Sequence, residues 1–410
     1  MINKKIGKII GPVAGVMLFI ATIGIMPVKA YAAETQILQN STSNIENENK
    51  SYEIEQNGIK FKVSDIVGTR NRIKLNATIT KEDGMEELDN HRNVEFRMYM
   101  ENVDENSSGT SWDSTDSKTV EIKKEMESEQ GFPEKGIIRA DLVMGEYDFN
   151  GSLVIPVDFT ESFKQYVEKK LDVGVDNDTK ITGFESDIIG TRVIVRKSVE
   201  DDERYGGYYD GKMDPIFIIK VGNKIYCAEN MSGYSYGDDD VYYTCSFDTE
   251  ALTYNDIKDA EEISIIPVKC NLTYDEIRKK YNNDSYYEEM QNKKIVTDNV
   301  KYNKDIEFAD GTKGSIKVER TGGNINVYCS SDSDINSFIA ALGINGMFAD
   351  ETYDSVYFEE NKTIFKDENQ ENQYVVQIKD SHPDMTCEVD MSVIYLFADK
   401  YELDDEIKIN

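Results

Sequence analysis

The sequence has 410 residues, enough for two or three domains, and carries 78 Asp and Glu against 46 Lys and Arg, for a formal net charge of −32. A chain this acidic is repelled by nucleic acid and by anionic lipid, which excludes nucleic-acid binding as its main role. Only two His residues are present, so the composition lends little support to His-based catalysis or His-ligated metal sites.

The first 32 residues have the pattern of an export signal. Lysines precede an apolar run at residues 9–28, and the small-x-small pattern Ala30-Tyr31-Ala32 follows it. We predict cleavage after Ala32. The alternative is a retained single-pass anchor with its N-terminus inside, because about 20 mainly apolar residues can span a bilayer. Either way, residues 33–410 are expected to be extracellular or at the cell surface, and only the N-terminal segment would contact the membrane.

Residues 33–51 are polar and lack a periodic apolar face, which predicts a flexible stalk. The motif SDIVGTR at residues 64–70 follows it, between two stretches of alternating apolar and polar residues. That arrangement is typical of a β-hairpin. A second copy, SDIIGTR, occupies residues 186–192, and six of the seven letters agree.

We interpret the duplicated motif as the opening turn of a repeated domain. Under this interpretation the two carboxylates accept hydrogen bonds from turn amides, and the arginines cover the rim of the hairpin. The alternative is a binding or catalytic set, which would require residues about 120 positions apart to converge. The repeated turn positions are Asp65, Gly68, Arg70, Asp187, Gly190 and Arg192.

Both copies end alike, with Ile-Pro-Val at residues 155–157 and 266–268, followed by a Thr and a short helical pattern. Thr273 and Glu276 have capping-box spacing. Proline cannot donate a ladder hydrogen bond, so each Ile-Pro-Val predicts an edge or terminal strand. Several short strands between these ends, separated by polar turns, indicate an antiparallel sandwich.

The predicted fold is therefore mainly β, with tandem antiparallel immunoglobulin-like β-sandwich domains joined by short helices, after the N-terminal signal or anchor helix. A third, modified β-rich domain is expected to include a short helix near residues 335–342. The predicted segments are a signal or anchor at 1–32, the stalk at 33–51, repeats at 52–160 and 178–272, helical connectors at 161–177 and 273–294, and the third domain at 295–410.

The stretch NGIKFKVSDIVGTRNRIKLNATI resembles the opening of a domain family of unknown function from Gram-positive bacteria. The resemblance implies an exported or singly anchored protein, often with a second immunoglobulin-like domain, and often encoded beside an extracytoplasmic-function sigma factor. The family has no established catalytic residues, so the resemblance assigns none to this chain. One departure is that only Met1–Lys8 precede the apolar run, too few to hold a sigma factor.

Two further features lie near a predicted hairpin in the second repeat. Cys227 and Cys245 flank it and are the pair expected to form a disulfide, if one forms. Between them, Asp238, Asp239 and Asp240 could supply oxygen ligands to Ca²⁺. Adjacent residues on an extended chain point to different sides, so a solvated acidic loop is the favoured interpretation. No other cofactor is predicted.

The segment from residue 205 to residue 243 is dense in Tyr, Gly and Ser, a composition typical of recognition loops. Its candidate binding residues are Tyr205, Tyr208, Tyr209, Tyr234 and Tyr236. The expected partner is an extracellular protein or a glycan.

No nucleophile elbow, zincin motif or phosphate-binding loop is present in the sequence. We therefore predict a non-catalytic binding or sensory module at the cell surface or secreted, with a link to envelope signalling. Two alternatives remain open at this point: a structural spacer or adhesin-like stalk, and a carbohydrate-active enzyme.

Overall fold

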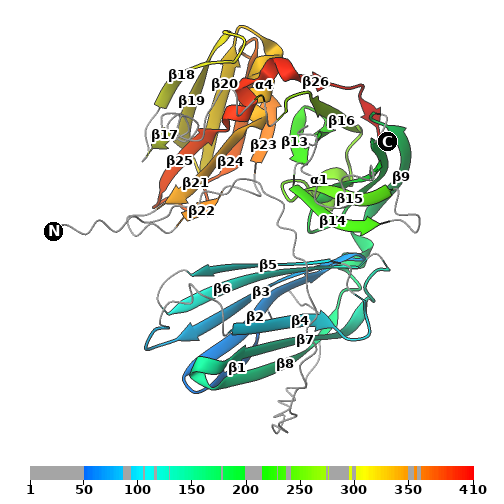
Figure 1. The fold of residues 1–410 in the computed structure, drawn as a ribbon, viewed down its shortest axis with the longest axis vertical. Coiled ribbons are helices and arrows are strands. Elements are labelled where there is room, and N and C mark those ends of the chain that lie inside the picture. The colour runs from blue at the N-terminus through cyan, green and yellow to red at the C-terminus, as the bar shows by residue number, and fades with distance from the viewer. Residues whose placement is uncertain are drawn as a thin grey trace, which may run out of the picture. The chain divides into compact units, whose positions relative to one another are not determined.

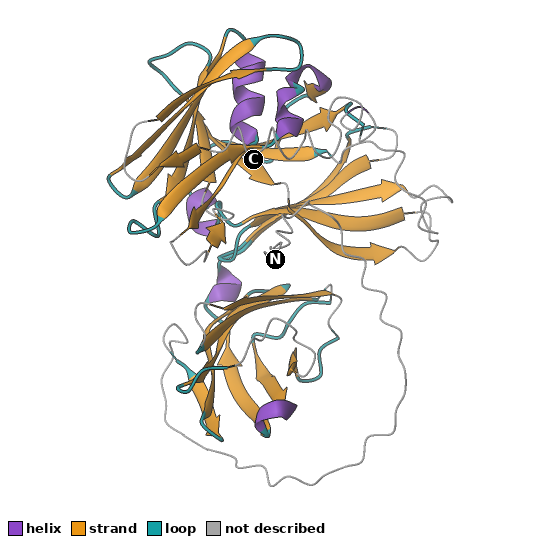
Figure 2. Ribbon diagram, turned by 60° about the vertical axis from the view of Figure 1, so that its left-hand side comes forward, coloured by secondary structure: helices purple, strands orange, loops and turns teal. Residues whose placement is uncertain are grey.

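The computed structural model describes residues 50–85, 94–104, 107–114, 118–128, 130–176, 179–198, 215–228, 230–236, 242–273, 276, 295–297, 302–349, 355–357 and 362–410. These residues are mainly β-strands in several antiparallel sheets, with few helices (Figures 1 and 2). The predicted signal, most of the stalk and most of the second helical connector lie outside them. Among the described residues, no helix is both long and apolar enough to cross a membrane.

The first β unit consists of two sheets that share one core. Alternation along β2 buries Ile59, Phe61 and Val63, and the inward residues of the opposite sheet include Phe149 and Ile155. One sheet has the order β1(Tyr52–Gln56), β2(Ile59–Gly68), β3(Arg72–Lys81), β6(Thr119–Glu127), β5(Ser107–Ser114), and the other β4(Val94–Met100), β7(Lys135–Met144), β8(Phe149–Asp158).

The second β unit repeats the order of the first unit's five-stranded sheet. Its strands are β9(Val167–Gly174), β10(Thr179–Ser186), β11(Thr191–Ser198), β15(Tyr242–Thr249) and β14(Asn230–Tyr236), in that spatial order. The helical connector predicted at residues 161–177 is therefore wrong for most of its length. Only Ser162–Lys164 form a short 3-10 turn, and β9 follows it as an edge strand of this sheet.

The second unit also contains β12(Ile216–Val221), β13(Lys224–Ala228) and β16(Ile263–Cys270), which belong to a ten-stranded sheet, and α1(Tyr254–Ile257) precedes β16. The two Ile-Pro-Val stretches lie in β8 and β16, which differ in position. Strand β8 is an edge strand, as predicted. Strand β16 is not, because it pairs with β12 on one side and with β26(Tyr401–Leu403) and β27(Ile407–Lys408) on the other.

The third β unit is joined to the second through one ten-stranded sheet. Strand β13 pairs with β23, where Lys224 lies opposite Phe365 and Ile225 opposite Ile364. The third unit contributes five neighbouring strands to this sheet, in the order β18(Tyr302–Glu307), β19(Lys313–Thr321), β20(Asn324–Ser331), β24(Gln373–Lys379) and β23(Lys362–Lys366). Its other strands form a separate four-stranded sheet, in the order β17(Ile295–Thr297), β25(Thr386–Met391), β21(Ile344–Ala349) and β22(Ser355–Tyr357).

Two local predictions in these units are confirmed. Helix α4(Asp334–Leu342) forms where a helix was expected, and Ser333 caps it by accepting a hydrogen bond from the Asn336 amide. Thr273 and Glu276 form the predicted capping box, in which the Thr273 amide donates to the Glu276 carboxylate at 2.9 Å.

Candidate functional site

Three of the four exposed large hydrophobic side chains among the described residues lie on the outer face of the sheet β4–β7–β8. These three are Tyr99, which is 41% exposed, Val143, which is 36% exposed, and Val154, which is 40% exposed. Because alternate residues of a strand point to opposite sides, the neighbours of these three fill the core and leave them in solvent. We call this surface the β7 face.

Cross-strand pairing groups the residues of the β7 face into rows. Tyr99 lies opposite Arg139, and Arg139 opposite Val154, so a Tyr, an Arg and a Val form one continuous row. In the next row, the Glu101 amide donates to the Ile137 carbonyl at 2.9 Å. The Arg139 guanidinium donates to the Glu101 carboxylate at 2.5 Å, and this hydrogen bond raises the pKa of Arg139.

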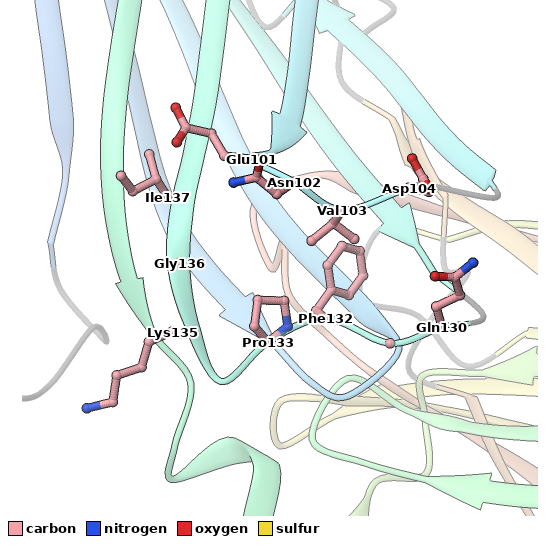
Figure 3. Close-up of a pocket in the computed structure, with 11 residues that line it drawn as sticks. Glu101, Asn102, Val103, Asp104, Gln130, Phe132, Pro133, Lys135, Gly136 and Ile137 are labelled. Carbon is pink, nitrogen blue, oxygen red and sulfur yellow. The ribbon is translucent and has the colours of Figure 1, made fainter.

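A hollow of about 660 Å³ adjoins the β7 face and shares Glu101 and Ile137 with it (Figure 3). Val103 and the buried Phe132 ring form an apolar wall, with Pro133 beside them. Polar residues stand at its edge: Asn102, Asp104, Gln130 and Lys135. A second hollow of about 510 Å³ shares Gln130 and Phe132 with the first.

Together these surfaces offer an exposed aromatic ring, a guanidinium–carboxylate pair and open hollows with apolar walls and polar edges. Such a combination suits contact with an extended polar ligand. Sequence reasoning missed this site. The strands themselves were predicted, but Ile137 and Val143 made both faces of β7 apolar, so the pattern did not show which face points outward.

The repeated motif does not form two equivalent turns. In the second copy, the turn spans residues 187–190, and Asp187 accepts hydrogen bonds from the amides of Ile189 and Gly190 at 2.8 and 3.1 Å. The predicted role of Asp187 is therefore confirmed. In the first copy, the turn comes later, where the Thr69 amide donates to the Arg72 carbonyl at 2.7 Å.

The predicted equivalence of Gly68 and Gly190 is accordingly wrong, because Gly68 is the last residue of β2 and pairs with Ile73. Asp65 also differs from its prediction. It lies at a bulge in β2 with a φ of 52°, and it accepts hydrogen bonds from Ser64 Oγ and Asn76 Nδ2 instead of turn amides. The bulge lets β2 continue to Gly68.

The two motif arginines have different surroundings. Arg70 is exposed, as expected for a hairpin rim, and its guanidinium lies 4.6 Å from the centre of the Tyr166 ring. Arg192 does not cover a rim. It is only 8% exposed, and it pairs with Glu185 at 2.6 Å and with Glu127 at 3.8 Å.

A buried ion pair links the first motif's hairpin to the second motif's turn. Arg72 Nη2 lies 2.7 Å from Asp187 Oδ1 and 3.0 Å from the Gly190 carbonyl oxygen, and its Nε donates to Asp187 Oδ2 at 3.3 Å. The two side chains are 3% and 6% exposed. The motif residues thus converge through Arg72, which sequence reasoning missed because it lies outside the repeated letters.

We name the cluster of Arg72, Asp187, Arg192, Glu185 and Glu127 the charged joint. Around it, the Tyr166 hydroxyl is half-buried, and this burial together with the nearby Glu185 carboxylate raises the pKa of Tyr166 far above its ordinary value. Each arginine of the joint has a carboxylate partner at hydrogen-bond distance, which offsets the cost of removing its charge from water. We therefore assign the joint a structural role.

Glu127 provides a test of the joint by pH. Burial raises its pKa above the ordinary value of 4.5, and neighbouring Asp248 and Glu125 add to the effect against the opposing influence of Arg192. The folded chain therefore binds this proton more tightly than the unfolded chain, so stability decreases as pH rises from 4.5 through the raised pKa. In Glu127→Gln this decrease is expected to disappear.

The measurement is urea unfolding followed by the fluorescence of Trp112, the single Trp of the chain, which lies on β5. The difference in stability between Glu127→Gln and the wild type should shift in favour of the variant as pH rises from 4.5 to neutral. Glu121→Gln, at an exposed position of the same strand, is the control. Parallel pH profiles for the wild type and Glu127→Gln would contradict the assignment.

The predicted disulfide between Cys227 and Cys245 is wrong. All five cysteines are thiols, and these two belong to different cores: Cys227 packs with the third unit and Cys245 with the core of the second. They lie on β13 and β15, which belong to different sheets.

Most of the other predicted site residues lie outside the described part of the chain. These are Tyr205, Tyr208, Tyr209, Asp238, Asp239 and Asp240. Tyr234 and Tyr236 lie on β14, and their side chains are not described. Within the described ranges, no group of three or more His, Cys, Asp or Glu residues is arranged to hold a metal ion.

No protein-family model and no curated protein matches this chain. Among solved structures, one that is similar in part is described as the crystal structure of the conserved domain protein from Bacillus anthracis. It shares 13% sequence identity with a TM-score of 0.38, covering 54% of this chain and 76% of that one. A likeness this weak assigns neither a family nor an activity.

Proposed function

We propose that this chain is an exported or cell-surface, non-catalytic binding or sensory module that contacts its partner through the β7 face. The observation that carries the proposal is the exposed row Tyr99–Arg139–Val154 on one sheet face, next to Glu101 and Ile137, which line an open hollow. Val143 is exposed on the same face, four residues farther along β7. Single exposed apolar residues are ordinary on a protein surface, whereas a group of them bordered by polar residues marks an interaction site.

The residue types on the β7 face favour binding. Tyr and Arg are enriched in interfaces because each combines contact area with hydrogen-bonding groups. Tyr99 next to the Arg139–Glu101 pair offers a flat ring and a charged hydrogen-bonding pair to the same ligand. An extracellular protein or a glycan could use both.

Location and domain type belong to the same proposal. The charged, apolar and small-residue pattern of residues 1–32 supports export, with cleavage after Ala32 or retention as a single-pass anchor. The two-sheet units support immunoglobulin-like domains, and the resemblance of residues 57–79 to the Gram-positive family supports a link to envelope signalling.

A structural spacer is the second candidate, and the charged joint favours it. The Arg72–Asp187 pair ties the first unit's β3 to the turn between β10 and β11 by three buried hydrogen bonds. A spacer needs such fixed connections but needs no β7 face, so the two candidates differ in their response to mutations on that face.

Retention on cells distinguishes the candidates. Fluorescently labelled residues 33–410 are incubated with intact Gram-positive cells, and Tyr99→Ser/Val154→Ser is compared with the wild type. We expect at least about a tenfold loss of apparent affinity, since removing two central contacts typically costs more than 1 kcal/mol each. Stability should change by less than about 0.5 kcal/mol, because both positions are exposed.

Leu403→Ser is the matched control, because Leu403 is the fourth exposed large hydrophobic residue in the described part and lies away from the β7 face, on β26. It should bind like the wild type. Equal retention of all three proteins would reject the β7 face, and no saturable retention of any would favour the spacer.

A further inference from the structure

The edge of strand β16 is covered by a segment from far along the sequence. In the first unit, β4 pairs with β7, and β7 is covered by β8, the next strand in the chain. In the second unit, β12 pairs with β16 in the same antiparallel manner. The place next to β16 is taken by β26 and β27, more than 130 residues later. We call residues 401–410 the strap.

The strap binds β16 mainly through its backbone. Tyr401–Leu403 pair with Val268–Cys270, and Ile407–Lys408 pair with Ser264–Ile265. Between these two short ladders, the Asp404 amide donates to the carbonyl of Pro267 at 2.9 Å. The ladder is interrupted near Pro267, which has no backbone N–H. The interruption therefore leaves no unpaired amide at Pro267.

Two apolar side chains anchor the strap at its ends. Tyr401 is 8% exposed and packs in the core shared with the third unit, whereas Ile409 is 4% exposed and packs in the core of the second unit. Asn410 adds a clip, in which its Oδ1 accepts from the Ile263 amide at 2.7 Å and its Nδ2 donates to the Ala260 carbonyl at 3.1 Å.

Acidic side chains between the two anchors form ion pairs with lysines of β16 and β12. Asp404 lies 2.8 Å from Lys269 Nζ, and Glu406 lies 3.4 Å from Lys220 Nζ and accepts from Ser264 Oγ. These contacts lower the pKa of both carboxyls, the Lys269 bond acting most on Asp404 and the Ser264 bond most on Glu406. Two carboxylates of the strap thus face lysines of β16 and β12.

We propose that the edge of β16 is a strand-accepting peptide site. Its ligand is an extended acidic peptide with an aromatic anchor, two carboxylates and an apolar anchor in the spacing of Tyr401, Asp404, Glu406 and Ile409. In this structure the chain's own strap occupies the site. Backbone pairing supplies the affinity and the alternating side chains supply the selectivity, as in other cases of strand addition. This site is independent of the β7 face.

A synthetic peptide of residues 401–410 tests the proposal in trans. The full chain carrying Ile409→Asp keeps its length but loses one anchor, so its own strap should be displaced by fluorescent wild-type peptide. We expect saturable binding by anisotropy, at least tenfold weaker binding of a peptide with Asp404→Asn and Glu406→Gln, and no binding of a scrambled peptide. The wild-type chain should bind far less peptide, because its own strap competes.

A second protein guards against a folding defect in that variant. A chain ending at Lys400 is refolded with and without the peptide, and its thermal unfolding is recorded. The peptide should raise the unfolding temperature, and the scrambled peptide should not. Absence of specific peptide binding to both proteins, or equal binding of the scrambled peptide, would overturn the proposal.

Discussion

Arg72→Ala is expected to destabilise the first β unit by about 3–5 kcal/mol, the cost typical of breaking a buried ion pair by removing one partner. Asp187 is only 4% exposed in the intact chain, and the substitution removes the guanidinium that pairs with its charge. The amides of Ile189 and Gly190 still donate to this carboxylate, but they carry no full positive charge. Removing both partners in Arg72→Ala/Asp187→Ala should cost less than the sum of the two single changes.

Trp112 fluorescence during urea unfolding measures this effect in the first unit alone, because no other Trp is present. Arg70→Ala is the matched control, because this neighbouring arginine is exposed and its guanidinium lies over the Tyr166 ring. Its loss should cost about 0.5–1 kcal/mol. If Arg72→Ala and Arg70→Ala shift the transition equally, the joint does not stabilise the unit.

Arg320→Ala is expected to have a similar effect in the third unit, about 3–5 kcal/mol. The Arg320 guanidinium pairs with both carboxylate oxygens of Asp380, at 2.7 and 2.8 Å, and donates to the carbonyls of His382 and Met385 at 2.6 Å each. Its side chain is 2% exposed. A single residue thus connects β19 to the segment that follows β24.

The readout differs from that for Arg72, because Trp112 lies in the first unit whereas Arg320 lies in the third. The far-UV circular dichroism transition should move to lower urea, whereas the Trp112 transition should stay unchanged. Lys366→Ala provides the control, since its pair with Asp334 is about half exposed and such pairs contribute less than about 1 kcal/mol. An unchanged dichroism transition in Arg320→Ala would contradict the assigned role.

Strands with one buried face could be predicted from the sequence, and strands without one could not. Alternation along β2 and β3 located both strands, because one face of each fills a core. Strand β9 was mistaken for a helix because Phe163, Val167 and Leu171 recur at helical spacing. As an edge strand with mostly exposed residues, it has little alternation, and pairing with β10 determines its structure.

The site depended on contacts between distant residues, which a single sequence does not show. The letters of SDIVGTR and SDIIGTR suggested equal roles for Asp65 and Asp187, yet a bulge in one hairpin and an Asp-centred turn in the other separate them. The partner of Asp187 is 115 residues away and outside the motif. The first two units are structurally equivalent in the strand order of their five-stranded sheets. Their shared sequence letters do not mark equivalent turns.

The proposed function is tested most directly by photo-crosslinking on living cells. A photoreactive phenylalanine analogue replaces Tyr99 in one protein and Leu403 in another, both presented as residues 33–410, and adducts are detected after illumination. The β7-face account predicts a discrete adduct from position 99 that excess unlabelled wild-type protein removes, and none from position 403. Adducts of equal yield from both positions, or none from position 99, would contradict it.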